Sequence, residues 1–122
     1  MNDEFVIGWN FLDGYSAFFE QDDATGYLYA LKDGAIFQHL HIYNRGTQDP
    51  PVKEADVLVI RSNDDSKVGV VIWEELRGII RLKTAETFKD NRGITDQEWL
   101  AGFAHKLVSD SNGVRRAFIT CQ

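Results

Sequence analysis

Residues 15–43, YSAFFEQDDATGYLYALKDGAIFQHLHIY, decide the fold, because three apolar and aromatic runs follow one another with only short loops between them. The loops Asp22–Gly26 and Lys32–Gly34 have hairpin length, and each carries the glycine that a positive φ requires. The stretch therefore predicts a three-stranded antiparallel meander. Its strands are Tyr15–Gln21, Tyr27–Leu31 and Ala35–Tyr43.

Counting outward from the two loops predicts the register, because the side chains of a strand alternate between two faces. The count pairs Gln21 with Tyr27 and Leu31 with Ala35. One face is then predicted to carry Tyr15, Phe19, Tyr27, Tyr29, Phe37, His39, His41 and Tyr43. The opposite face carries Phe18, Leu28, Ala30, Ile36, Leu40 and Ile42. We assign this aliphatic face to the core, since Leu and Ile have no polar atoms to satisfy.

Further strands are predicted on both sides of this meander. An alternating run precedes it, and a second meander follows the proline-containing loop Asn44–Pro51, which we interpret as a crossover between sub-sheets. These strands are Phe5–Leu12, Asp56–Ser62, Val68–Trp73 and Ile79–Lys83, with Glu74–Gly78 as the last connecting loop. The same counting predicts a purely aliphatic core face made of Leu58, Ile60, Val70, Ile72, Ile80 and Leu82.

One amphipathic helix is expected near the C-terminus. Thr95 and Glu98 have the spacing of a capping box, and apolar residues follow at helical intervals, which predicts a helix over Asp96–Val108. Val114–Thr120 has the alternation of a last strand. The fold class is therefore α+β and mainly antiparallel β: two β-meanders in a sandwich-like or strongly curved sheet, with the helix packed on it.

Composition and charge restrict the function classes. The 122 residues fit a single domain, residues 1–122, and the formal net charge of −6 argues against nucleic-acid binding and favours a basic partner. The single cysteine, Cys121, excludes an intrachain disulfide and favours the cytoplasm. We expect neither a signal peptide nor a membrane span, because no window holds a sufficiently long apolar run.

The aromatic face is the candidate site. Its proposed binding residues are Tyr15, Tyr27, Tyr29, Phe37, His39, His41 and Tyr43. Tyrosine combines a large contact area with a polar tip, which suits a ligand or protein contact surface. The competing interpretation, which we favour over binding, is that the helix or a second sheet covers this face. The packing of the helix decides between the two.

No catalytic constellation is recognised. His39 and His41 point to the same face of a strand and are candidate metal ligands, but a third ligand does not follow at close spacing. The alternative is one histidine hydrogen-bonded inside the aromatic layer and one at its edge. A nucleophilic Cys121 would require a neighbouring base and an ordered position, which is not expected next to the C-terminus, and the acidic residues gather at turns. We therefore expect no cofactor and a non-enzymatic protein.

Two segments, Thr25–Leu31 (TGYLYAL) and Leu40–Asn44 (LHIYN), resemble a family of small bacterial proteins classed as a domain of unknown function. The resemblance extends over residues 18–82. It implies a bacterial cytoplasmic origin and no established activity, so it supplies no catalytic residue.

Three functional hypotheses follow. The first is an acidic, non-enzymatic protein-binding module, a regulator or an immunity-type inhibitor of a basic enzyme. The alternative is a small-ligand or metal-dependent enzyme that uses His39 and His41. The third is a homodimer formed through a sheet edge or through the aromatic face.

Overall fold

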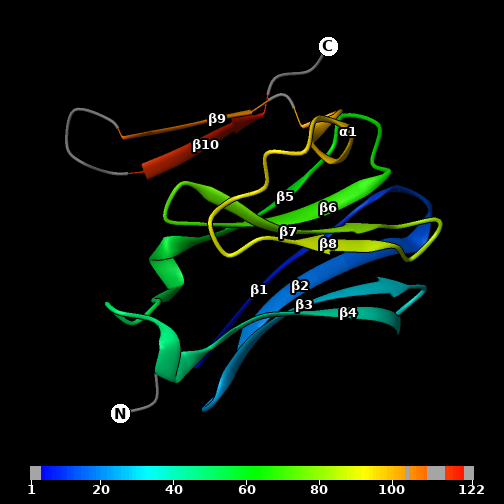
Figure 1. Ribbon diagram of the computed structural model, residues 1–122. Helices are drawn as coiled ribbons and strands as arrows, with labels where there is room; N and C mark the ends of the chain where they lie inside the picture. Colours follow the sequence, from blue (N-terminus) through cyan, green and yellow to red (C-terminus); the bar gives the residue numbers. More distant parts are fainter. Residues whose placement is uncertain (1–3, 104, 110–114, 120–122) are drawn as a thin grey trace.

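Two antiparallel four-stranded sheets pack face to face (Figure 1). This computed structural model describes residues 4–103, 105–109 and 115–119, without the side chains of Leu12 and of the last two ranges. The first sheet consists of β1 (Phe5–Asn10), β2 (Tyr15–Gln21), β3 (Thr25–Lys32) and β4 (Ala35–Asn44), in that order. The second consists of β5 (Val57–Arg61), β6 (Lys67–Ile72), β7 (Glu75–Arg81) and β8 (Thr87–Lys89), also in that order.

The smaller elements connect or follow the sheets. Three 3₁₀ turns are formed by Leu12–Gly14, Arg45–Thr47 and Glu54–Asp56. The short helix α1 (Gln97–Leu100) comes after β8, and β9 (His105–Ser109) then pairs with β10 (Arg115–Ile119). None of the helices in these described ranges has the length and apolar composition that crossing a membrane requires. The predicted mainly antiparallel α+β class with a single C-terminal helix is confirmed.

Two tight hairpins set the strand pairs. Asp33 and Gly34 have φ values of 51° and 85°, as a two-residue type I′ loop requires. Trp73 and Glu74 form the second such loop with φ values of 50° and 69°, although neither is a glycine. The predicted loop Glu74–Gly78 is therefore wrong, because β7 begins immediately after this turn, at Glu75.

The predicted register of β2 and β3 is wrong by one residue. Gln21 pairs with Gly26 rather than with Tyr27, so Phe18, not Phe19, lies opposite Tyr29. The reason is that Gly26 belongs to the strand and not to the turn. A Cβ atom there would lie 2.5 Å from Cζ of Tyr43, so the glycine is needed for a close approach in the core.

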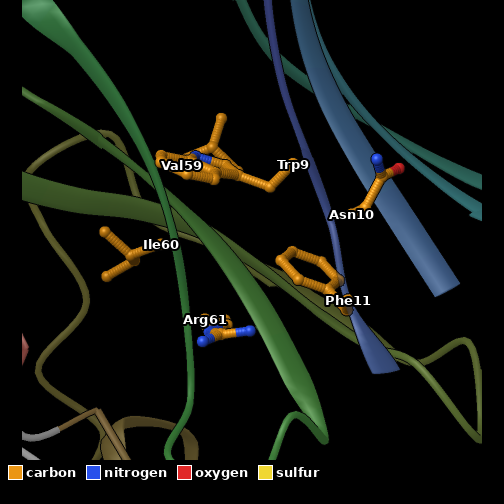
Figure 2. A pocket seen from close by; sticks show the side chains of 6 residues that line it. All are labelled: Trp9, Asn10, Phe11, Val59, Ile60 and Arg61. Carbon is orange, nitrogen blue, oxygen red and sulfur yellow. The ribbon is translucent and has the colours of Figure 1, made fainter. Parts of the chain in front are cut away.

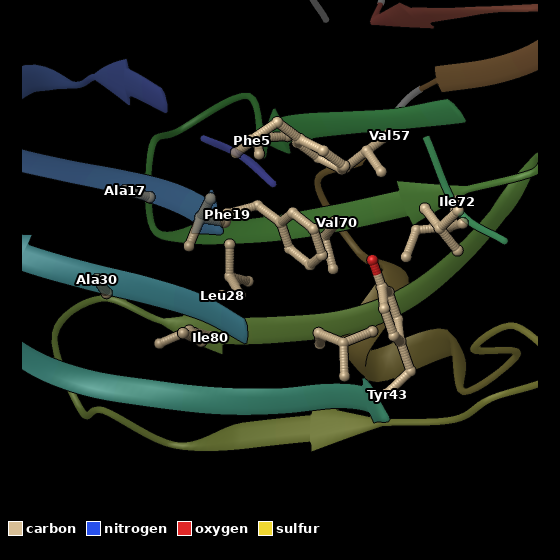
Figure 3. Close-up of a cluster of buried hydrophobic side chains, with 14 of the residues drawn as sticks. Phe5, Ala17, Phe19, Leu28, Ala30, Tyr43, Val57, Val70, Ile72 and Ile80 are labelled. Atoms are coloured by element: carbon tan, nitrogen blue, oxygen red, sulfur yellow. The ribbon is translucent and has the colours of Figure 1, made fainter. Parts of the chain in front are cut away.

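The main core lies between the two sheets (Figure 3). β1 lies over β5, β3 over β6 and β4 over β7. Buried side chains enter this core from both sheets: Phe5, Ala17, Phe19, Leu28, Ala30, Ile42 and Tyr43 from the first, and Val57, Val59, Val68, Val70, Ile72 and Ile80 from the second. Each large side chain buried here contributes about 1.5–3 kcal/mol.

The second sheet is also covered on its outer face. Ile60, Val71, Leu76 and Ile79 pack there against Ile94, Trp99, Leu100 and Phe103. The predicted face of the second meander is correct for Val70, Ile72, Ile80 and Leu82, which lie together in the main core. It is wrong for β5, because Val57 and Val59 enter the core whereas Ile60 joins the outer cluster and Leu58 is 37 % exposed.

The predicted helix Asp96–Val108 is wrong beyond Leu100. The helix begins where expected, but its N-cap is Asp96, whose carboxylate accepts from the amides of Glu98 and Trp99. Gly102 then turns the chain with a φ of 87°, and His105–Ser109 forms β9. The predicted strand Val114–Thr120 corresponds to β10, with Val114 and Thr120 outside the described residues. The strand β8 was not predicted.

Candidate functional site

The outer face of the first sheet carries a continuous cluster of five rings, which we term the outer aromatic face: Phe18, Tyr27, Tyr29, His39 and His41. Phe18 stacks on Tyr29 with ring centroids 4.6 Å apart, and the Tyr27 and Tyr29 centroids are 5.9 Å apart. His41 meets the Tyr27 ring edge-on at 5.2 Å. The rings thus form one connected surface across β2, β3 and β4.

Strand pairing creates this cluster. Tyr29 lies between its two cross-strand partners, Phe18 on β2 and His39 on β4, whereas Tyr27 lies between Glu20 and His41. Cross-strand neighbours on one face are close enough for direct contact between large side chains. Phe18 was missed by the sequence reasoning. The signal that could have found it is Asp22, whose carboxylate accepts from the amides of Ala24 and Thr25 and so shortens the predicted loop.

No described segment packs on the outer aromatic face. The second sheet covers the opposite face of β1–β4, and α1 packs on the far side of that second sheet. The favoured prediction that the helix or a second sheet covers the aromatic set is therefore wrong for Tyr27, Tyr29 and the two histidines. Exposed apolar side chains extend the surface on both sides: Val6 on β1 is 58 % exposed, and Ile36 on β4 is 53 % exposed.

The charge beside Tyr27 and Tyr29 is negative. Glu20 lies directly opposite Tyr27, and its carboxylate has no salt bridge among residues 4–103. Burial raises the pKa of the Tyr29 hydroxyl, and the nearby carboxylates of Glu20 and Asp22 raise it further. Backbone hydrogen bonds from Ala24 and Thr25 lower the pKa of Asp22, so this carboxylate stays ionised. A cation approaching the rings therefore meets both π-faces and carboxylates.

Three of the predicted site residues lie elsewhere. Tyr43 is buried between the sheets, because the register of β3 and β4 shifts between Gly26 and Tyr27. Tyr15 packs against the main core and meets the Phe37 ring edge-on at 6.0 Å. Phe37 leaves the predicted face because a second shift, between Ala30 and Leu31, makes it the extra residue of β4. Only four predicted residues, Tyr27, Tyr29, His39 and His41, are therefore brought together.

The nitrogens of His41 already have protein partners. Nε2 lies 2.9 Å from Oδ1 of Asn44, and Nδ1 lies 3.3 Å from Nζ of Lys89, which also donates to the His41 carbonyl oxygen at 2.9 Å. An ammonium group beside the imidazole opposes a metal ion there. No group of three or more His, Cys, Asp or Glu residues suited to a metal occurs within the described chain. The side chain of His105 and Cys121 lie outside the described residues.

A cleft at the edge of the sandwich, which we term the edge cleft, is a second candidate site (Figure 2). It opens where the edge strands β1 and β5 face each other and has a volume of about 370 Å³. Its lining consists of Trp9, Asn10, Phe11, Val59, Ile60 and Arg61. This volume is within the range of small-molecule sites. A shallower depression over Gly8 lies beside Phe18 on the outer face of the first sheet.

The fold and these sites define the chain as a two-sheet antiparallel β protein with an edge cleft and an aromatic surface that none of the described segments covers. A family model described as "Uncharacterized protein conserved in bacteria (DUF2251)" matches residues 3–108. The chain belongs to this family, which confirms the resemblance noted in its sequence. Comparisons with curated proteins and with solved structures found no significant match.

Proposed function

We propose that this chain is a small, acidic, non-enzymatic protein-binding module, a regulator or immunity-type inhibitor, which binds a basic protein through the outer aromatic face. The observation that carries the proposal is the contrast between the two sheets. The outer face of the second sheet is covered by residues 94–103, whereas the five rings on the first sheet are left without a covering segment among the described residues. Exposed patches of this kind mark interaction surfaces.

The composition of the face supports a protein partner. Tyrosine and phenylalanine are enriched in the centres of protein interfaces, where the surrounding contacts exclude water from them. The described cation–π contacts involve Tyr15, Trp73, Trp99 and Phe103, so the rings of Phe18, Tyr27 and Tyr29 are left for an external cation. Arginine or lysine from a partner would satisfy this chemistry.

The charge supports a basic partner. The net charge of −6 and the carboxylates of Glu20 and Asp22 beside the rings attract a positively charged surface over long range. Such attraction mainly increases the association rate and weakens with salt. We propose the cytoplasm as the compartment of this interaction, because a sequence with one cysteine does not depend on disulfides.

The test is affinity capture from a lysate of the bacterial source, with the intact protein as bait. A Tyr29→Ala/His39→Ala variant removes two rings of the outer aromatic face, and Leu58→Ala serves as control because Leu58 is an exposed apolar residue on the second sheet. We expect one basic protein that binds the wild type and the control stoichiometrically and is lost with the double variant. Circular dichroism and thermal melting check that each bait is folded.

The captured protein, once purified, should form a 1:1 complex by light scattering, and its association rate should fall as salt increases. Equal capture by the double variant would contradict the proposed surface. If the wild-type protein is itself a dimer and the Tyr29→Ala variant is a monomer, the partner of this face is a second copy of the chain and not a basic protein. The metal-dependent enzyme is not favoured, because Lys89 and Asn44 already contact the ring nitrogens of His41.

A further inference from the structure

The edge cleft contains two aromatic side chains whose rings have no aromatic or cationic neighbour. Among the aromatic residues of 4–103, Trp9 and Phe11 alone take part in neither a ring–ring contact nor a cation–π contact. Trp9 is also 57 % exposed, which is unfavourable for the largest apolar side chain. Both residues line the same cleft.

The two rings come from the end of β1 (Phe5–Asn10), with Phe11 one residue beyond the strand. Trp9 and Phe11 are two positions apart, and Figure 2 shows both side chains extending from the β1 side toward β5. Exposed aromatic rings on the wall of a cleft offer a large apolar contact area to a flat ligand ring. The cleft therefore suits a planar aromatic group, with Val59 on the β5 side.

The cleft also offers one cation, from the β5 side. The Arg61 side chain is 52 % exposed, and its only salt bridge among the described residues joins Nε to Oδ1 of Asp65 at 3.5 Å. The terminal nitrogens have no hydrogen bond to the described protein. Arg61 lines the cleft together with Trp9 and Phe11, as Figure 2 shows. Two parallel N–H groups of arginine match the two oxygens of a carboxylate.

We propose that the edge cleft binds a small planar aromatic carboxylate, with its ring against Trp9 and Phe11 and its carboxylate on the terminal nitrogens of Arg61. The apolar walls exclude water from the ring, and the charge-assisted pair orients the molecule. Asp65 competes with the ligand carboxylate for Arg61. The site lies at the β1–β5 edge and shares no residue with the outer aromatic face, so it is independent of the proposed protein partner.

The experiment titrates the intact, ¹⁵N-labelled protein with 2-naphthoate and follows the indole N–H signal of Trp9, assigned with a Trp9→Phe variant. We expect a saturable shift with a Kd below about 1 mM. The neutral analogue 2-naphthamide, which has the same shape, should bind about tenfold more weakly, because a charge-assisted pair is stronger than a neutral one.

Three variants assign the carboxylate contact. Arg61→Gln should weaken 2-naphthoate about tenfold and bring it level with 2-naphthamide, whereas Arg92→Gln, at an exposed position away from the cleft, should change nothing. Asp65→Asn should tighten binding, because it frees the guanidinium. The proposal is overturned if 2-naphthoate causes no saturable shift of the Trp9 signal, or if it binds wild type and Arg61→Gln equally well. All these variants change exposed or partly exposed side chains, so folding is not at risk.

Discussion

The Tyr43 hydroxyl donates a hydrogen bond of 2.5 Å to Oε1 of Gln21, and both residues are buried between the two sheets. Nε2 of Gln21 donates in turn to the Val52 carbonyl oxygen at 3.2 Å. This short polar chain connects β4, β2 and the segment between the sheets; Figure 3 shows the Tyr43 ring among the apolar side chains of the core. Buried polar groups with satisfied hydrogen bonds favour one packing arrangement over its alternatives.

Replacing Tyr43 by phenylalanine should destabilise the protein by about 1–3 kcal/mol, because the change removes a buried hydrogen bond but keeps the aromatic ring in place. Chemical denaturation measures the loss. Tyr27→Phe is the matched control, since Tyr27 lies on the outer aromatic face, and its effect should stay within about 0.5 kcal/mol. Equal effects of the two changes would show that the Gln21 contact is not stabilising.

Because Tyr43 is buried in its protonated form, the free energy of unfolding should fall at high pH. Burial raises the pKa of Tyr43 well above its usual value, so the folded state keeps a proton that the unfolded state releases near pH 10. The stabilising contribution is complete below about pH 10 and is lost as the pH rises through the folded-state pKa. Denaturation between pH 9 and about 11 measures this loss. In Tyr43→Phe the decline should be shallower, and an unchanged slope would contradict the assignment.

Gly26→Ala should destabilise the core by about 1–3 kcal/mol or more. A Cβ at this position would lie 2.5 Å from Cζ of Tyr43 and 2.8 Å from Cζ of Phe19, and both rings are packed in the interior. Gly46→Ala is the control, because a Cβ there meets nothing within 4 Å and its φ is not positive. The melting temperature of Gly26→Ala should therefore be clearly lower than that of the wild type, whereas that of Gly46→Ala should be close to it.

Asp64 should contribute to acid stability. Hydrogen bonds from the Ser66 hydroxyl, the Ser66 amide and the Ser62 hydroxyl lower the pKa of Asp64 to about 2. Because the unfolded-state pKa is about 4, the contribution is present above pH 4 and is lost as the pH falls from about 4 to about 2. Solvent screens this exposed group, so the effect is small. Asp64→Asn should flatten the stability profile in this window, as measured by denaturation at each pH.

Lys67 should hold the segment that covers the second sheet. Its ammonium group donates to the carbonyl oxygens of Trp99, at 3.1 Å, and of Ala101, both at the C-terminal end of α1. Lys67→Met removes these bonds and should destabilise the protein by about 1–3 kcal/mol, with increased amide exchange in residues 94–103. The control is Lys83→Met at an exposed site. Unchanged exchange in that segment would rule out this role of Lys67.

The order of strands was predictable because it depends on local signals. Alternating apolar residues and the Asp33–Gly34 turn were sufficient for β2, β3 and β4, and β2 has the predicted bounds. The hairpin at Trp73 and Glu74 was missed because non-glycine residues rarely adopt a positive φ. The helix was predicted too long because Leu107 and Val108 fit helical spacing as well as a strand.

The candidate site was only partly predictable. Tyr27, Tyr29, His39 and His41 share a face whatever the exact register, because the shift of β4 conserves their alternation. The placement of Phe18, Tyr43 and Phe37 required the observed shifts, since a one-residue slip moves a side chain to the other face. The edge cleft was not predictable, because Trp9 and Arg61 are far apart in the sequence.

The sequence by itself determined the strands β1–β7, their antiparallel arrangement and the family, because side-chain alternation and turn residues act over a few neighbouring positions. Only the tertiary structure decided which faces are covered. Gly26 sets the register by making room for the Tyr43 ring, and α1 packs on the second sheet rather than on the aromatic rings. Both outcomes depend on packing between residues distant in the chain, and this packing leaves the outer aromatic face and the edge cleft open to solvent within the described structure.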